Sequence, residues 1–459
     1  MNKILRELEG KKILILGFGR EGESTLRFLK KWVKDCTYAV ADMSPIEVQD
    51  KAIKVFSGKD YLNAIDGCEV VFKTPGIPNK LPEIKRAKEN GIKITSQTKL
   101  FFDLCQGNII GVTGTKGKST TTTLIYWILK KSGRKAILLG NIGKPCLDYL
   151  DNDFGKGKDF VFEMSAHQLS DLEKSPQIAV FLNIFKEHLD YYEDYADYIE
   201  AKAHITLNQK ENDIFVYNSD FDKLQNIAEK SKAKKLSFSL SGKSNAFISN
   251  NSIFIKVGDK TEKVIDINSV PLKGAHNLNN VMAASLAAFA AGIPTKEIGN
   301  AIKSFEHLEH RLDVVGTYRG ITFIDDSLAT IPEATMAAMR AFDHQVGSII
   351  LGGTDRGQDF KNLAKEVVVQ NIETVILFPP TGERIWKNIT DLNPQKPPKH
   401  FFVQGMKEAV EICYKNTPKG KVCLMSSAAP SFGVFKNYED KAEQFRENVR
   451  SLKIGNSNL

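Results

Sequence analysis

The 459-residue sequence predicts an α/β protein with three domains. Two observations predict this class. Short apolar runs alternate with helix-length patterns along the chain, and the runs are followed by loops rich in Gly, Ser or Asp. The chain is also too long for one ordinary domain. We place the three domains at residues 1–105, 106–309 and 310–459.

The composition is that of a soluble globular protein, with 42% hydrophobic and 26% charged residues. The net charge of +8 is spread along the chain, which suits anionic small molecules and gives no dense basic block for nucleic acid. Six scattered cysteines without a CxxC pair indicate reduced thiols rather than disulfides or zinc. The chain start lacks a signal-peptide core, and no run approaches the ~18 apolar residues of a membrane span, so we expect a cytoplasmic protein without membrane insertion.

The first domain opens with an apolar strand at 13–16, and the turn Gly17–Gly22 follows with the pattern G-x-G-x-x-G before a helix. A second strand ends at Asp42. This order predicts a Rossmann-like domain that binds a pyrophosphate. The motif by itself does not distinguish between two ligands, the dinucleotide of an oxidoreductase and a UDP-sugar. The strand within Val70–Pro78 ends in another turn, at an edge where α/β sheets bind ligands.

The second domain contains the stretch around which the chain is organised, a glycine-rich loop at Gly114–Thr120. An apolar strand precedes the loop and a helix pattern follows it. Val112 stands where the longer phosphate-loop pattern has glycine, but the shorter G-x-x-G-K-S form is intact. The backbone N–H groups of such a loop bind phosphates, Lys118 reaches the terminal phosphates, and a hydroxyl of Ser119 or Thr120 binds Mg²⁺.

Further polar residues follow the strands of this domain. Glu163 ends one strand, His188 follows the next, and Lys202 lies on a helix pattern fourteen residues later. A carboxylate at Glu163 can bind Mg²⁺ directly or through water. A helix is predicted from about Asn279 to Ala291, with His276, Asn277 and Asn280 at its start.

The third domain repeats the alternation of strand and helix. Its strands are predicted at 321–324, 348–351, 374–378 and 421–425, and the first ends in Asp325-Asp326-Ser327. We therefore predict a second Rossmann-like parallel sheet, with its functional edge at these strand-end loops.

Taken together, these motifs resemble the Mur ligase family of ATP-dependent amide-bond ligases, over essentially the whole chain. The resemblance rests on the ordered motifs Gly114–Thr120, Glu163–Gln168, Asn183–Asp190, His276-Asn277-x-x-Asn280, His310-Arg311-Leu312 and Asp325-Asp326-Ser327. Ser431-Phe432 and Phe435–Tyr438 are similar to the glutamate-adding branch of the family.

The resemblance implies a reaction. ATP phosphorylates the alanine carboxylate of UDP-N-acetylmuramoyl-L-alanine, and the amine of glutamate, D-glutamate by default, attacks the acyl phosphate. ADP and phosphate leave. Positioning and charge neutralisation by Lys118 and Mg²⁺ drive the phosphoryl transfer. The implied role is peptidoglycan synthesis, and with it cell-wall growth, cell shape and division.

The resemblance also implies the site residues. Lys118, Glu163, His188 and Lys202 are the catalytic residues. Ser119 or Thr120 with Glu163 binds one Mg²⁺, and His188 with a carbamylated Lys202 binds a second. ATP is bound by Gly114, Thr115, Lys116, Gly117, Lys118, Ser119, Thr120, Asn280, Arg311 and Asp326, between the second and third domains. The sugar nucleotide and glutamate are bound by Gly17, Gly19, Arg20, Glu21, Gly22, Asp42, Thr74, Gly76, Asn141, Ser165, Gln168, Thr330, Arg356, Ser431, Phe432 and Tyr438.

Two departures concern the glutamate pocket. Leu328 and Arg356 stand where D-glutamate ligases usually carry lysines, and Arg does not replace Lys simply. The L-glutamate-adding variant of the reaction therefore stays open. The first domain also lacks an acidic residue that many relatives carry near Ser96–Leu100, which leaves the uracil contacts open.

The sequence disfavours two other functions. A folylpolyglutamate synthase-like ligase is disfavoured because such proteins typically lack a domain like residues 1–105. A nucleotide-sensing binding protein is disfavoured by Glu163, His188 and Lys202. We expect a monomer.

Overall fold

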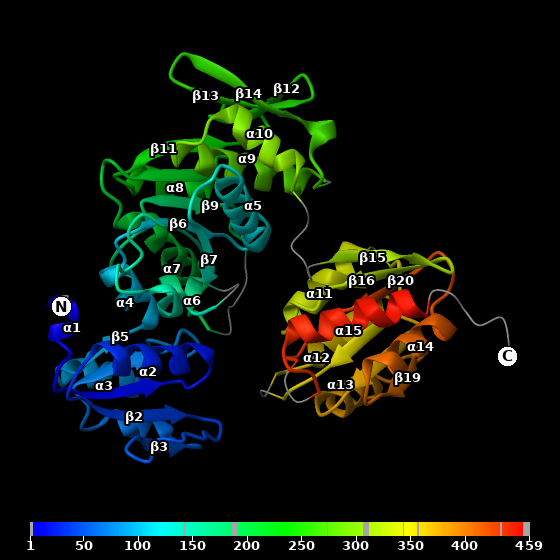
Figure 1. Cartoon of the computed structure of the whole chain (residues 1–459), viewed down its shortest axis with the longest axis horizontal. Coiled ribbons are helices and arrows are strands. Elements are labelled where there is room, and N and C mark those ends of the chain that lie inside the picture. The colour runs from blue at the N-terminus through cyan, green and yellow to red at the C-terminus, as the bar shows by residue number, and fades with distance from the viewer. Residues whose placement is uncertain are drawn as a thin grey trace. The chain divides into compact units, whose positions relative to one another are not determined.

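The structure is a computed structural model that describes residues 3–140, 144–185, 191–272, 274–305, 312–342, 344–355, 358–431 and 434–452. The chain divides into two compact units, residues 1–305 and 306–459, each with its own apolar cores. Figure 1 shows three sheets with their covering helices, two in the first unit and one in the second. The predicted α/β class with three sheet domains is confirmed.

The first sheet has five parallel strands in the order β3-β2-β1-β4-β5. Because β1 lies between β2 and β4, the loops that follow β1 and β4 leave the sheet at the point where the strand order reverses. Ligands bind at such a point in open α/β sheets. The elements are α1 (Lys3–Arg6), β1 (Lys12–Leu16), α2 (Arg20–Trp32), β2 (Thr37–Asp42), β3 (Lys54–Ser57), η1 (Tyr61–Ile65), β4 (Val70–Lys73), α3 (Pro82–Glu89), β5 (Lys93–Thr95) and α4 (Gln97–Leu104).

The second sheet has nine strands in the order β14-β13-β12-β11-β10-β9-β6-β8-β7. From β7 to β12 the neighbours are parallel, and the antiparallel strands β12–β14 form one end of the sheet (Figure 1). The strands are β6 (Asn108–Thr113), β7 (Ala136–Gly140), β8 (Asp159–Glu163), β9 (Ile178–Phe181), β10 (Ile214–Asn218), β11 (Lys234–Phe238), β12 (Ala246–Ser249), β13 (Ser252–Val257) and β14 (Lys260–Asp266). The helices are α5 (Lys118–Lys131), η2 (Cys146–Tyr149), α6 (Ala166–Leu169), α7 (Tyr195–Leu207), α8 (Asp222–Lys230), η3 (Ile267–Ser269), α9 (Ala275–Ala290) and α10 (Thr295–Lys303).

Helices α5 and α9 share one apolar core beneath this sheet. Leu124 and Ile128 of α5 belong to the same cluster as Val281 and the buried alanines of α9. Small side chains let two helices approach closely. This packing fixes α5, whose first residue is Lys118, against the sheet.

The third sheet has six strands in the order β15-β16-β20-β17-β18-β19. Only β15 is antiparallel to its neighbour, so the predicted parallel sheet gains one antiparallel edge strand. The elements are β15 (Asp313–Tyr318), β16 (Ile321–Asp325), α11 (Pro332–Ala341), β17 (Val346–Gly352), α12 (Lys361–Val369), β18 (Thr374–Phe378), α13 (Thr381–Thr390), β19 (Lys399–Phe402), α14 (Met406–Asn416), β20 (Val422–Met425) and α15 (Tyr438–Ser451).

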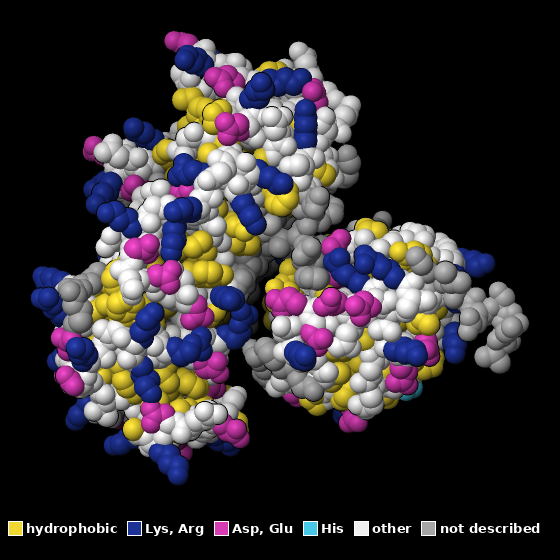
Figure 2. Space-filling view, in the orientation of Figure 1, with side chains coloured by type: hydrophobic (Ala, Val, Ile, Leu, Met, Phe, Trp, Pro, Cys, Tyr) yellow, Lys and Arg dark blue, Asp and Glu magenta, His cyan; other side chains and the backbone are white. Residues whose placement is uncertain are grey.

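Positive and negative side chains are mixed on the surface, as the spread of charge along the sequence predicts. Figure 2 shows lysines and arginines interspersed with acidic side chains on the face in view. Among the described residues, no helix has the length and apolar character needed to cross a bilayer.

Candidate active site

The glycine-rich loop at 114–117, which we predicted as the phosphate loop, joins β6 to α5. Gly117 has a left-handed backbone with φ +84°, and a side chain there would overlap the Asn280 side chain of α9. Glycine is therefore required at this position for two reasons. The loop ends at the N-terminus of α5, which carries partial positive charge and suits an anion.

Asn183, just after β9, holds the loop in shape. Its side-chain oxygen accepts hydrogen bonds from the backbone N–H groups of Thr115 (3.1 Å) and Lys116 (2.8 Å), and its amide donates to the Lys116 carbonyl (2.9 Å). Our sequence reasoning gave Asn183 no role of its own. The available signal was a polar residue directly after a buried strand.

Two lysines converge on one carbonyl oxygen of the loop. Lys118 Nζ donates to the Gly114 oxygen at 2.9 Å, and Lys202 Nζ of α7 donates to the same oxygen at 3.0 Å. Lys202 is only 1% exposed, and it also donates to Thr113 Oγ1 at 3.3 Å. Two lysine side chains from different helices therefore meet at this end of the loop.

Glu163 ends β8 beside the phosphate loop, since Val112 of β6 pairs with it in the sheet. Its side chain is 3% exposed, and its Oε2 atom has no hydrogen-bond partner among the described residues. A buried carboxylate oxygen without a partner is costly, and a hard cation such as Mg²⁺ would satisfy it. Within the described ranges, no cluster of three or more His, Cys, Asp or Glu residues forms a metal site.

The glycines of the first turn fall into two kinds. Gly17 has φ +90°, and a side chain there would overlap Thr74, while a side chain at Gly22 would overlap the Gly17 carbonyl. Gly19 faces open space, as does Gly76 in the turn after β4. Asp42 caps the first turn by accepting from the Phe18 N–H group at 2.7 Å. The two turns therefore pack together, while Gly19 and Gly76 have no neighbouring atom where a side chain would begin.

Three predicted substrate residues meet where the first sheet domain contacts the second. Gln168 donates to the Glu21 carboxylate at 3.2 Å and accepts from the Ser165 N–H group at 3.0 Å. Burial raises the pKa of the Glu21 carboxyl, and the Gln168 hydrogen bond opposes that shift. Arg20 lies exposed at the first residue of α2.

In the second unit, Asp326 follows β16 and is 1% exposed. Its carboxylate accepts from Ser426 Oγ at 2.7 Å and from the Leu312 N–H group at 3.3 Å. The Ser431 hydroxyl is buried, and it has no hydrogen-bond partner among the described residues. Thr330 and Tyr438 are half-buried.

Lys441 of α15 is a buried residue that sequence reasoning missed. Its ammonium contacts Ser427 Oγ, and it lies within electrostatic reach of Asp325 and Asp326. Burial lowers the pKa of Lys441 to about 8, and the two aspartates oppose the shift. A lysine inside an α-helix pattern gives no sequence signal of such burial.

Several predicted residues cannot be assigned contacts. Asn141, His188, Arg311, Arg356 and Phe432 lie outside the described residues. Asn280 belongs to the first unit and Asp326 to the second. Ser119 and Thr120 are half-buried in the first turn of α5, and Lys116 is exposed.

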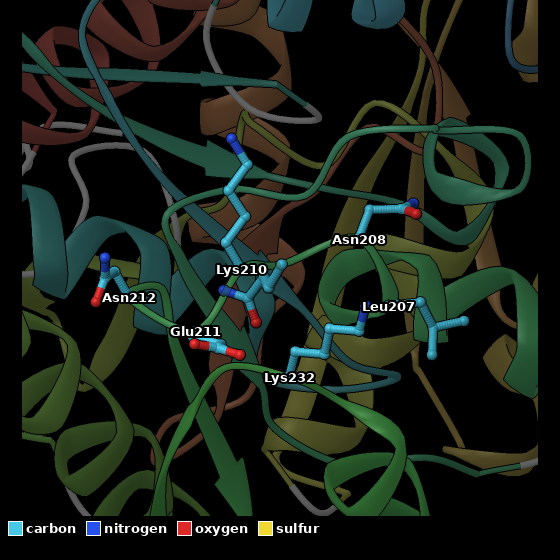
Figure 3. Close-up of a pocket in the computed structure, with 7 residues that line it drawn as sticks. Leu207, Asn208, Lys210, Glu211, Asn212 and Lys232 are labelled. Atoms are coloured by element: carbon cyan, nitrogen blue, oxygen red, sulfur yellow. The ribbon is translucent and has the colours of Figure 1, made fainter.

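A surface hollow of the first unit lies apart from this chemistry. Figure 3 shows it lined by Leu207, Asn208, Lys210, Glu211, Asn212 and Lys232, in the segment between α7 and β10 and the loop before β11. None of the predicted site residues lines it. We therefore build the site from the loops that follow β1, β4, β6, β8 and β9.

Three protein-family models match the chain in succession. Residues 11–96 match "Mur ligase MurD-like, N-terminal domain", residues 112–288 match "Mur ligase middle domain", and residues 310–429 match "Mur ligase, glutamate ligase domain".

Curated relatives match over nearly the full length. The UDP-N-acetylmuramoylalanine–D-glutamate ligase of Ruminiclostridium cellulolyticum is 30% identical, and the match covers 99% of each chain. The protein of the same name from Geobacillus kaustophilus is 33% identical, over 98% of this chain and all of its own. The MurF ligase of Thermotoga maritima, solved in complex with ADP, is 18% identical with a TM-score of 0.52, over 98% of this chain and 100% of that one. This last likeness shows a shared fold.

Proposed function

The chain belongs to the Mur ligase family, and we propose that it is the ATP-dependent ligase that joins D-glutamate to UDP-N-acetylmuramoyl-L-alanine in peptidoglycan synthesis. The observation that carries the proposal is the end-to-end match to D-glutamate ligases. The phosphate loop, with two lysines on the Gly114 carbonyl, supplies the chemistry that such a reaction needs.

The reaction begins with phosphoryl transfer. The loop N–H groups and the N-terminus of α5 bind the phosphates of ATP, and Lys118 moves from the Gly114 carbonyl to the transferred group. The alanine carboxylate oxygen attacks the γ-phosphorus, and ADP leaves. Because little covalent help is needed in such a step, positioning and charge neutralisation supply most of the rate.

The amide bond forms in the second step. The glutamate amine attacks the acyl carbon, a proton leaves the nitrogen, and inorganic phosphate departs with one oxygen of the original carboxylate. The glutamate contacts come from the second unit, where Ser431, Thr330 and Tyr438 are the proposed ligands. The buried Ser431 hydroxyl, without a partner in the described part of the chain, supports this assignment.

Magnesium is proposed at the phosphate loop. Ser119 or Thr120 with Glu163 would hold one ion, and His188 with a carbamylated Lys202 would hold a second. The partnerless Glu163 oxygen fits the first site. Bound Mg²⁺ neutralises charge on the phosphates. At Lys202, the N–H retained by a carbamate can keep a hydrogen bond to Thr113 Oγ1 or to the Gly114 carbonyl, both of which accept from the amine now.

The setting of the reaction is also proposed. Asn280, Arg311 and Asp326 are assigned to ATP, and the Gly17–Gly22 turn, Asp42 and Asn141 to the sugar nucleotide. The described cysteines are all unpaired, which suits the reducing cytoplasm. We propose a monomer, because the substrate turn and the phosphate loop belong to one chain.

The test is a comparison of glutamate enantiomers. Purified protein receives ATP, Mg²⁺, UDP-N-acetylmuramoyl-L-alanine and either D- or L-glutamate, and released phosphate and product mass are followed. We expect D-glutamate to drive phosphate release matched by product. Phosphate release with L-glutamate but not with D-glutamate would favour the L-glutamate-adding variant, which Leu328 and Arg356 leave open. Absence of phosphate release with both enantiomers would contradict the ligase assignment.

A further inference from the structure

The turn after β4 is held from two sides by hydrogen-bond donors. Lys73, which is 3% exposed, donates its ammonium to the Ile77 carbonyl at 2.6 Å and to the Thr74 carbonyl at 3.4 Å. The Tyr191 hydroxyl donates to the Pro75 carbonyl at 3.1 Å and to the Ile77 carbonyl at 3.4 Å. The turn at residues 74–77 therefore has three of its carbonyls fixed by side chains.

These two donors come from different sheet domains of the first unit. Lys73 ends β4 of the first sheet, whereas Tyr191 lies just before α7, which packs on the second sheet. The turn itself packs on the Gly17–Gly22 turn, since Thr74 fills the space beside Gly17. Tyr191 thus ties the ligand-binding edge of the first sheet to the second.

The Tyr191 ring is itself held in a row of aromatic rings. It stands perpendicular to the His167 ring with centroids 4.1 Å apart, and its centroid lies 4.9 Å from that of Tyr192. The Tyr192 centroid lies 5.3 Å from that of Tyr198. The Tyr198 hydroxyl lies 3.4 Å from Thr115 Oγ1 in the phosphate loop, and Lys202 Nζ lies 5.1 Å from its ring centroid. The row therefore runs from the 74–77 turn to the phosphate loop.

Rings in such contact have defined relative orientations and resist independent rotation. Burial also raises the pKa of Tyr191 to about 12, so the phenol stays a donor well into the alkaline range. A donor that is fixed by its ring and aimed at backbone carbonyls sets the position of those carbonyls.

We propose that Tyr191 is a positioning residue: its hydroxyl, together with the Lys73 ammonium, holds the 74–77 turn at a fixed place relative to the phosphate loop, so that the sugar nucleotide bound at this turn presents its carboxylate to ATP. The inference rests on the proposed function for the identity of that ligand. We call the hydrogen bonds from Tyr191 and Lys73 to the 74–77 turn the clasp. These hydrogen bonds form without any bound ligand.

The chain offers a matched control one residue away. Tyr192 is buried, and its hydroxyl has no hydrogen-bond partner among the described residues. Tyr191→Phe and Tyr192→Phe each remove one oxygen from neighbouring rings of the same row. Only the first removes hydrogen bonds to the turn. A general loosening of the aromatic row would affect both variants alike, whereas loss of the clasp affects only one.

Two measurements on full-length protein test the proposal. In steady-state kinetics, we expect Tyr191→Phe to lower kcat/KM for UDP-N-acetylmuramoyl-L-alanine by roughly threefold to tenfold, the loss expected of about one hydrogen bond, with the KM for ATP within about twofold. In hydrogen exchange without ligand, we expect faster exchange of amides in the 74–77 turn. Tyr192→Phe should match the wild type in both, and Lys73→Met should loosen the turn from its other side.

The outcomes are separable from the proposed function. If the wild type has no ligase activity, the proposed function is wrong. The hydrogen-exchange experiment still tests the clasp in that case, because it needs no substrate. Unchanged turn exchange and unchanged kcat/KM in Tyr191→Phe would overturn the clasp, as would equal effects of the two phenylalanine variants. Faster exchange throughout Tyr191→Phe, rather than in the turn, would show a merely structural role and also overturn it.

Discussion

At the scale of single residues, the Gly114 carbonyl oxygen is the centre of the proposed site. It accepts hydrogen bonds from both Lys118 and Lys202, which bring two ammonium groups from α5 and α7 to one point. The loop that these two lysines contact is the one to which we assign the phosphates of ATP, and substitution of each lysine tests that assignment.

Lys118→Ala tests this assignment at the loop. We expect turnover to fall by at least about a thousandfold, because the transition-state charge on the transferred phosphoryl loses its cation. Thermal unfolding should be nearly unchanged. Lys130→Ala, at the other end of α5 and exposed, is the control and should keep wild-type activity. Near-normal kcat in Lys118→Ala would show that the loop has been misassigned.

Lys202→Ala tests the proposed carbamate. The variant should be inactive, and short carboxylic acids that occupy the place of the carbamate should restore part of the activity. The measurement is the rate of phosphate release against acid concentration, with Lys118→Ala as a variant that acids should not rescue. If Lys202 acts only as an amine, then added acids will restore nothing.

The burial of Lys73 makes the free energy of unfolding depend on pH. Burial lowers its pKa from 10.5 to about 8; Asp171 and Glu21 oppose the shift, and Lys88 and Lys99 add to it. Between about pH 8 and 10.5, the unfolded chain binds a proton that the folded protein has released, so stability rises with pH in that range. Below about pH 8, the folded protein carries the full cost of the buried cation.

Lys73→Met isolates this dependence. The free energy of unfolding of the wild type, relative to that of Lys73→Met, should increase as pH rises from about 8 to about 10. Urea unfolding at several pH values measures the difference. A flat difference across that range would mean that Lys73 titrates near its ordinary pKa.

The residues that sequence reasoning missed act through distant contacts. Asn183 bonds a loop some 67 positions earlier in the chain, and Tyr191 bonds a turn about 116 positions earlier. Such partners depend on the fold and leave no local pattern. By contrast, the glycines and Lys118 were predictable, because a strand, a tight turn and a helix start are local events.

At the scale of elements, the strands were the most predictable. Buried parallel strands are short apolar runs, so β1, β6, β8 and β17 were anticipated to within a few residues. The apolar run at 178–184 predicts a longer strand than the structure has, because β9 ends at Phe181. Leu182 still donates to the Thr113 carbonyl of β6 at 3.0 Å, but Asn183 and Ile184 lie outside the strand.

The predicted start of α9 was also wrong. We predicted a start near Asn279 with polar caps, but the helix begins at Ala275 after Gly274, which has φ +94° and makes no side-chain cap. Asn280 therefore lies in the second turn, where its oxygen faces Gly117 of the phosphate loop and its amide donates to Asn277. The asparagines favoured a cap from sequence, but their packing against the loop places them inside the helix.

The first glycine turn yields a prediction for two neighbouring positions. Gly17→Ala should destabilise the protein by about 1–3 kcal/mol, because a side chain there has a left-handed backbone and overlaps Thr74. Gly19→Ala meets open space and should change stability by less than about 0.5 kcal/mol, while it weakens sugar-nucleotide binding. Urea unfolding and calorimetric titration separate the two effects. Equal destabilisation by both substitutions would contradict this distinction.

At the scale of the whole molecule, the repeated alternation of strand and helix predicted three α/β domains, and each of the three sheets lies within one of the predicted segments. The sequence could not predict which domains form one compact unit. The first two do so through contacts such as Gln168–Glu21 and the pair of Ser24 and Arg27 with Asp148. These contacts join loops and helix faces that have no shared sequence signature.

The proposed reaction requires one chain to bring ATP and the sugar-linked carboxylate together so that the phosphoryl group passes directly between them. The most direct test uses UDP-N-acetylmuramoyl-L-alanine with ¹⁸O in its alanine carboxylate, together with ATP, Mg²⁺ and D-glutamate. We predict that each turnover carries one ¹⁸O atom into the released inorganic phosphate. Unlabelled phosphate, released at the same rate as product, would contradict the acyl-phosphate route and the site built for it.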